Sequence, residues 1–183
     1  MSTTIRELEP KEVWNRFADI NAVPRPSKKE QKITAFMVDF GKKLGLETTS
    51  DAIGNVIIRK PATAGLENKK TIILQSHLDM VCQKNNDTVF DFDTQGIETY
   101  IDGDWVRAKG TTLGADNGMG VAAIMAILES KTIAHPAIEA LFTEASLSTE
   151  ELQEQSQTLS EVLALLEEKG DRWLELSMKD SDQ

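Results

Sequence analysis

A short apolar run in the segment KTIILQS, residues 70–76, restricts the fold of this 183-residue chain more than any other feature. Continuous apolar runs of this length are typical of strands that are buried on both faces of a parallel sheet. We therefore expect residues 70–76 to form a central strand of an α/β domain. Two polar residues, His77 and Asp79, follow at the point where such a strand would end.

The segments around this strand alternate between helical and strand patterns. Ser27 and Glu30 match the S-x-x-E capping box of an amphipathic helix, and Gly45 marks its end. The pair Asp102-Gly103 lies between two strand-like runs, which is the usual signal of a tight hairpin. The other expected elements are a helix over 9–23, strands over 54–60 and 137–143, and a nearly all-apolar helix over 117–130. This order predicts a three-layer α/β domain.

Composition narrows the classes of function. Hydrophobic residues make up 40% of the chain and charged residues 27%, as in soluble globular proteins. The formal net charge of −10 disfavours nucleic acid and anionic membranes as partners, and no apolar run approaches the ~20 residues that span a bilayer. The single Cys82 excludes an internal disulfide, and no secretory signal pattern is visible. We therefore expect a cytoplasmic protein.

Charge divides the chain near Glu144. Residues 1–143 carry 17 basic and 19 acidic side chains, whereas residues 144–183 carry 3 and 11. Large apolar residues recur every seven positions in this acidic tail: Leu152, Leu159, Leu166 and Trp173. We expect two parts, 1–143 and 144–183. The second is an amphipathic helix that packs on the domain or on a partner, and a homo-oligomeric coiled coil is the less favoured alternative.

His77 and Asp79 are the first candidate site residues. Residues i and i+2 of a strand point to the same side, and ligands of open α/β sheets bind beyond the carboxyl ends of the strands. A neutral imidazole is a good zinc ligand, and a nearby carboxylate can orient it. A structural histidine beside a turn-forming aspartate explains the same pattern equally well.

Asp116 is the second candidate, in the glycine-rich segment GTTLGADNGMG. Glycines let the backbone approach a ligand closely, and a carboxylate held there can bridge two cations. The alternative is a loop whose Asp or Asn caps the following helix. A third interpretation takes Gly118, Gly120 and Ala123 as the G-x-G-x-x-A of a dinucleotide-binding domain, with Glu144 as the ribose carboxylate.

Two further residues have simpler explanations. Cys82 could act as a thiol nucleophile, but no oxyanion donors or orienting third group are recognisable, so a small packed hydrophobe explains it better. His135 precedes a proline, which favours extended backbone, and we expect it to begin a strand rather than bind metal.

Five segments of the chain carry a family resemblance. They are LEPKEVWNRFADINAVPRPSKKEQKI, DAIGNVIIRKPAT, LQSHLDMVCQKN, WVRAKGTTLGADNGMGVAAIMAILE and HPAIEALFT. Together they resemble, over about residues 5–143, the N-terminal part of the aminoacyl-histidine dipeptidases, a carnosinase-like branch of the M20 metallopeptidases. The resemblance implies a three-layer α/β/α zinc-peptidase-like domain, two zinc ions, and hydrolysis of Xaa-His and other short dipeptides.

The resemblance also assigns the site residues. It makes His77 a zinc ligand, Asp79 the acidic residue that orients it, and Asp116 the carboxylate that bridges two zinc ions. Two cations that share a carboxylate can polarise a peptide carbonyl and activate a bound water for attack, which a glutamate then deprotonates.

The chain departs from the family pattern after ALFT. The family continues there with one residue and then Asp-Glu-Glu, which supplies the general base and a further ligand, whereas this chain has Ala145, Ser146 and Leu147. The family's later ligands have no counterpart. We therefore expect an incomplete domain, truncated or fused. Because zinc takes about four ligands, we expect this domain to bind zinc weakly or not at all and to lack ordinary dipeptidase turnover.

Two alternatives remain beside the zinc dipeptidase. The tail segment LLEEKGDRWLELS is similar to the helical C-terminal ends of ABC-F type ATPases, without a nucleotide-binding motif. The second hypothesis is a non-catalytic interaction or dimerisation protein, in which the C-terminal helix dimerises or covers the sheet edge left by the missing strands. The dinucleotide-binding domain is the third.

Overall fold

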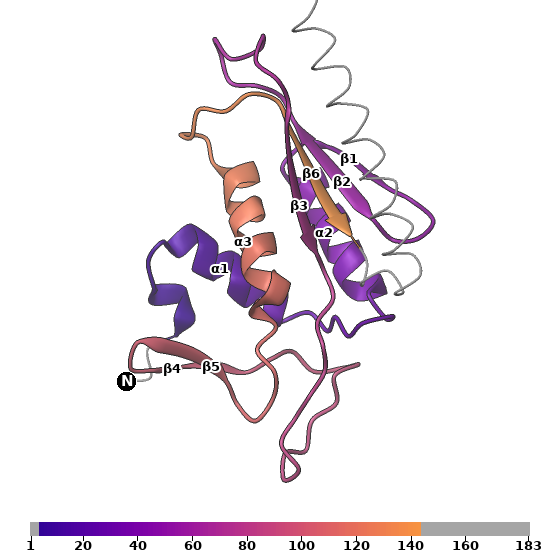
Figure 1. Cartoon of the computed structure of the whole chain (residues 1–183), viewed down its shortest axis with the longest axis vertical. Helices are drawn as coiled ribbons and strands as arrows, with labels where there is room; N and C mark the ends of the chain where they lie inside the picture. The colour runs from indigo at the N-terminus through magenta and orange to yellow at the C-terminus, as the bar shows by residue number, and fades with distance from the viewer. Residues whose placement is uncertain (1–3, 144–183) are drawn as a thin grey trace, which may run out of the picture. The chain divides into compact units, whose positions relative to one another are not determined.

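Four strands form the main sheet in the computed structural model, which describes residues 4–143. Along the sheet order the strands are β1 Glu47–Ser50, β2 Val56–Lys60, β6 Ile138–Thr143 and β3 Ile72–His77. β2 is antiparallel to β1 and β6, whereas β3 is parallel to β6 (Figure 1). The last strand of the described chain thus lies inside the sheet. A separate hairpin consists of β4 Thr99–Asp102 and β5 Trp105–Ala108.

Helices pack against one face of this sheet and on one another. They are the 3-10 helix η1 Ile5–Glu7 and the α-helices α1 Lys11–Asn21, α2 Gln31–Lys43 and α3 Ala115–Glu129. α2 lies against β1 and β2, α3 lies against β3, and α1 packs on α3 (Figure 1). None of the helices in residues 4–143 is long and apolar enough to cross a membrane.

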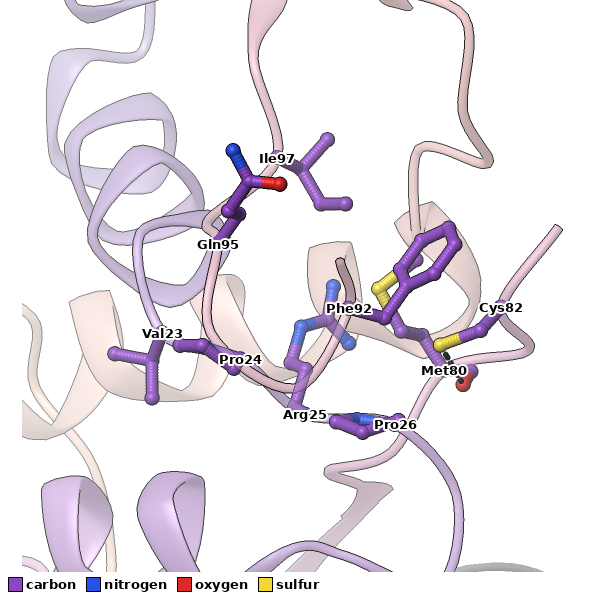
Figure 2. A pocket seen from close by; sticks show the side chains of 9 residues that line it. All are labelled: Val23, Pro24, Arg25, Pro26, Met80, Cys82, Phe92, Gln95 and Ile97. Carbon is purple, nitrogen blue, oxygen red and sulfur yellow. Dashed lines mark hydrogen bonds between the residues drawn. The ribbon is translucent and has the colours of Figure 1, made fainter. Parts of the chain in front are cut away.

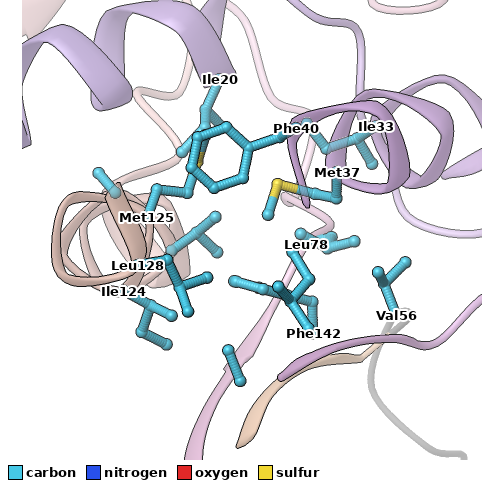
Figure 3. Close-up of a cluster of buried hydrophobic side chains, with 14 of the residues drawn as sticks. Ile20, Ile33, Met37, Phe40, Val56, Leu78, Ile124, Met125, Leu128 and Phe142 are labelled. Carbon is cyan, nitrogen blue, oxygen red and sulfur yellow. The ribbon is translucent and has the colours of Figure 1, made fainter. Parts of the chain in front are cut away.

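The hydrophobic core lies between these helices and the sheet (Figure 3). Ile58 of β2, Ala140 of β6 and Leu74 of β3 are register neighbours on the covered face. Met37 of α2 and Met125 of α3 are fully buried above them. Each large apolar side chain removed from water in this way contributes about 1.5–3 kcal/mol, so the core fixes the helices on the sheet.

The opposite face of the sheet carries a different set of side chains. Arg59 bonds to Glu47 at 2.7 Å and to Glu139 at 2.8 Å across three neighbouring strands. Ile73, next to Glu139 in the register, is 65% exposed. Residues 4–143 therefore supply the sheet and one layer of helices, and the second helical layer expected from the sequence is not among them.

The strand over 70–76 is present as β3, and its parallel pairing is confirmed. The prediction that it is buried on both faces is wrong for the described residues, because Ile72 and Ile73 are 45% and 65% exposed. Among residues 4–143, Ile73 lies on the face of the sheet that no helix covers, and β3 pairs only with β6 and so forms the edge of the sheet. β1 was not predicted, since its sequence ETTS contains no apolar residue.

The predicted hairpin and most helix limits are confirmed, but one cap is wrong. The β4–β5 register pairs Asp102 with Trp105, and Gly45, with φ of +71°, follows the end of α2. α2 begins after Glu30, which has no side-chain cap bond, so Ser27 and Glu30 do not form the expected capping box. The tail helix and the separate part 144–183 lie outside the described residues.

Candidate metal site

His77 is the last residue of β3, at the carboxyl end of the parallel pair, where it faces Thr143 of β6. Its ring nitrogen Nδ1 lies 2.8 Å from Oδ1 of Asp79, which is only 5% exposed. The Ser27 hydroxyl donates to the other oxygen of the same carboxylate. Because a carboxylate accepts the Nδ1 proton, this arrangement fixes the ring and leaves the Nε2 lone pair directed away from Asp79.

Asp116 meets that second nitrogen. Its Oδ1 lies 3.2 Å from His77 Nε2, although the two residues are 39 positions apart. The start of α3 is irregular, with Gly114 left-handed, Asp116 outside helical geometry and a cis peptide bond between Asp116 and Asn117. The Asp116 side chain is 96% exposed, so its carboxylate can accept a further contact.

The two atoms that face one another are both electron-pair donors when Nε2 is unprotonated. They attract one another only through a shared proton or a cation. This geometry suits a metal ion held between an imidazole and a carboxylate, a combination that zinc accepts. Within residues 4–143, however, no group of three or more His, Cys, Asp and Glu side chains could hold a metal ion. The described residues therefore fit half of one tetrahedral zinc site and do not fit a complete two-metal centre.

Arg25 and Ser27 contact the same region, and the sequence patterns did not identify either. Arg25 is buried and donates to the carbonyl oxygens of Leu78 at 3.2 Å and of Gly114 at 2.7 Å. Burial lowers the pKa of Arg25 to about 10, and the charge of Asp79 opposes that shift. Both residues belong to the VPRPS break between two helices, where no periodicity exists to indicate which side chains point inward.

The glycines of the segment 110–120 are required by contacts inside the protein. A Cβ on Gly118 would lie 2.8 Å from Nη2 of Arg25 and 3.0 Å from Phe17, and a Cβ on Gly120 would meet Asn117 and Ser76. The dinucleotide interpretation also lacks its βαβ unit, because β5 before α3 lies in the separate hairpin. The topology therefore disfavours a dinucleotide-binding domain.

Cys82 lines a small cavity of about 10 Å³ together with Arg25, Met80 and Phe92 (Figure 2). This volume suits one water molecule at most. Burial raises the pKa of the Cys82 thiol, which disfavours the thiolate that a nucleophile needs. Cys82 therefore behaves as a packing residue. His135 is buried three residues before β6, and its Nδ1 lies 2.7 Å from the Pro136 carbonyl, away from the site.

The described residues have the α/β fold of M20 metallopeptidase domains, with the His-x-Asp at the end of the parallel strand. Comparison with known proteins is more specific. Over 139 residues the chain is 49% identical to the cytosol non-specific dipeptidase of Escherichia coli (strain K12), a match that covers 76% of this chain and 29% of the relative. No family model matches the chain.

Comparison with solved structures also finds peptidases. The aminoacylhistidine dipeptidase of Vibrio alginolyticus matches with a TM-score of 0.78 and 48% identity, over 80% of this chain and 30% of that one. The aminopeptidase PepT of Bacillus cereus matches with a TM-score of 0.58 and 27% identity, over 73% and 36%. Residues of this chain are therefore similar to part of these dipeptidases, and the chain spans less than a third of the length of the first two relatives.

Proposed function

We propose that residues 4–143 form one wall of a metal-dependent dipeptidase site, in which His77 and Asp116 bind metal and Asp79 orients His77. The approach of His77 Nε2 to Asp116 Oδ1 at 3.2 Å is the observation that carries this proposal. An imidazole and a carboxylate are ligands that zinc accepts, so zinc is the proposed metal. The proposed substrates are short peptides, including Xaa-His.

The residues of this wall have separate tasks. Asp79 accepts the Nδ1 proton of His77, and this interaction holds the ring with Nε2 toward Asp116. Asp116 presents an exposed carboxylate that can serve two cations at once. When bound, the metal would polarise a peptide carbonyl and activate a water molecule. The proton acceptor for that water is not among the residues of this wall.

The 183-residue chain by itself is proposed to bind zinc weakly and to lack ordinary turnover. The described residues provide two ligands where zinc takes about four. Ala145, Ser146 and Leu147 stand where the resemblance expects Asp-Glu-Glu, so the sequence offers no general base at that point. A cytoplasmic location is part of the same proposal, in keeping with the cytosolic relative.

Zinc titration and dipeptide hydrolysis on one purified sample test this proposal. We expect weak binding that His77→Ala and Asp116→Ala each remove, and no metal-dependent cleavage of Gly-His or β-Ala-His. His135→Ala is the matched control, because His135 is buried away from the site and should leave the affinity unchanged. Stoichiometric tight binding with turnover would refute the weak-site proposal, and binding unaffected by His77→Ala would refute the ligand assignment.

A second proposal, an interaction protein, rests on the edge position of β3. An exposed strand edge can pair with another chain, and Ile72 and Ile73 add exposed apolar surface there. Homo-oligomers through this edge or through the acidic tail are the form that we would expect. Sedimentation of the full chain and of a chain that ends at Thr143 tests this, since monomers in both cases would remove the proposal.

A further inference from the structure

Arg25 connects the two segments that carry the candidate metal ligands. Its Nη1 donates to the carbonyl oxygens of Leu78 at 3.2 Å and of Asp79 at 3.4 Å, directly after His77. Its Nη2 donates to the carbonyl oxygen of Gly114 at 2.7 Å, two residues before Asp116. One planar group therefore holds both segments at once.

The guanidinium is an expensive group to bury, which argues against a role as simple filling. Arg25 is 2% exposed, and its hydrogen bonds go to neutral oxygens, the fourth being Oδ1 of Asn21 at 3.1 Å. An apolar side chain of similar volume would fill the same space without the desolvation cost of a charge. What it could not do is join carbonyl groups of two different segments, because only a rigid fork of donors reaches both.

The backbone around Arg25 reinforces the connection on each side. The carbonyl oxygen of Arg25 accepts the Met80 amide at 3.0 Å, which pairs the VPRPS break with the chain after His77. On the other side, Gly118 packs so closely that an added Cβ would lie 2.8 Å from Nη2. The close fit explains why small residues flank Asp116 in the sequence.

We propose that Arg25 is a positioning residue that sets the separation of His77 and Asp116, and thereby the affinity of this site for a divalent metal. The inference rests on the proposed function, since it takes these two residues as ligands. Arg25 itself touches neither metal nor substrate. It acts through the carbonyl groups of Leu78, Asp79 and Gly114.

Hydrogen exchange of the metal-free chain with Arg25→Met tests the positioning itself. We expect the amides of Met80 and Gly118 to exchange about tenfold faster or more than in the wild type, while the amides of β1 and β2 keep their protection. Arg16→Met is the matched control, because it removes another arginine that bonds to Glu129 and Asp19, outside the site. Protection that is unchanged, or that falls evenly along the chain, would overturn the inference.

Zinc titration followed through the His77 ring signals gives the second readout. Arg25→Met is expected to weaken zinc binding about 10- to 100-fold, as is usual for groups that orient ligands, whereas Arg16→Met should have less than a twofold effect. Equal losses in the two variants would overturn the inference. If the wild-type chain binds no zinc, the proposed function fails, but the metal-free exchange experiment still decides the role of Arg25.

Arg25→Lys covers the case in which the methionine variant does not fold. Lysine keeps the charge but has a single nitrogen and cannot bridge both segments. It should therefore keep the fold and still show the selective exchange at Met80 and Gly118. Full wild-type protection and zinc affinity in Arg25→Lys would show that charge alone suffices, and would overturn the bridging role.

Discussion

Replacement of Asp79 by alanine should destabilise the chain by about 2–4 kcal/mol. The carboxylate is 5% exposed and accepts hydrogen bonds from His77 Nδ1, at 2.8 Å, and from Ser27. Hydrogen bonds to a charged group contribute roughly 1.5–3 kcal/mol each, and part of this returns when His77, which is partly exposed, is solvated by water. The loss also removes the negative charge that most favours the buried guanidinium of Arg25.

Urea unfolding followed by far-UV circular dichroism measures this effect. A loss of 2–4 kcal/mol is a large share of the roughly 5–15 kcal/mol that stabilises a typical domain, so the midpoint should fall clearly. Asp93→Ala is the control, because Asp93 forms an exposed ion pair with Lys29 and should cost less than about 1 kcal/mol. A loss below about 0.5 kcal/mol for Asp79→Ala would refute the view that this carboxylate is a structural centre of the site.

Three other outcomes can be checked. Phe142→Ala, in the fully buried core, should lower the free energy of unfolding by about 3–5 kcal/mol in the same urea assay, and a loss near 1 kcal/mol would contradict the core. The hydrogen bond from Asn55 lowers the pKa of Asp51, so the stability that Asp51 contributes is present at neutral pH and is lost as pH falls below about 4. Thermal melts should accordingly show less acid sensitivity for Asp51→Asn, and an unchanged profile would contradict this. Ile73→Lys should leave stability within about 1 kcal/mol but abolish any self-association through β3 in sedimentation, and association that persists would exclude that edge.

The elements with strong local patterns could be predicted from the sequence. The apolar run before His77 specified β3, and Asp102-Gly103 specified the β4–β5 hairpin. β1 lacks such a signal, since its four residues are polar and it exists because β2 offers it an edge. The exposure of Ile73 was also not predictable from the local sequence, because it depends on which layer of the fold covers its face of the sheet.

The candidate site was predictable in part. Strand periodicity places His77 and Asp79 on the same side, and their contact at 2.8 Å agrees with that expectation. The approach of Asp116 depends on how α3 packs against β3, which spacing along the chain does not encode. Ser27 illustrates the limit: its pattern indicates a helix cap, but tertiary packing brings its hydroxyl to Asp79 instead.

The position of β6 has a consequence for synthesis on the ribosome. β2 and β3 do not pair with each other. Each of them pairs with β6, residues 138–143. The sheet therefore stays in two unjoined pieces, with its apolar face open, until nearly all of the described chain has left the exit tunnel. Non-local strand pairing of this kind is slow, so the nascent chain presents an aggregation-prone surface during most of its translation. We expect chaperones that hold apolar segments to engage it before residue 138 emerges, and to release it afterwards.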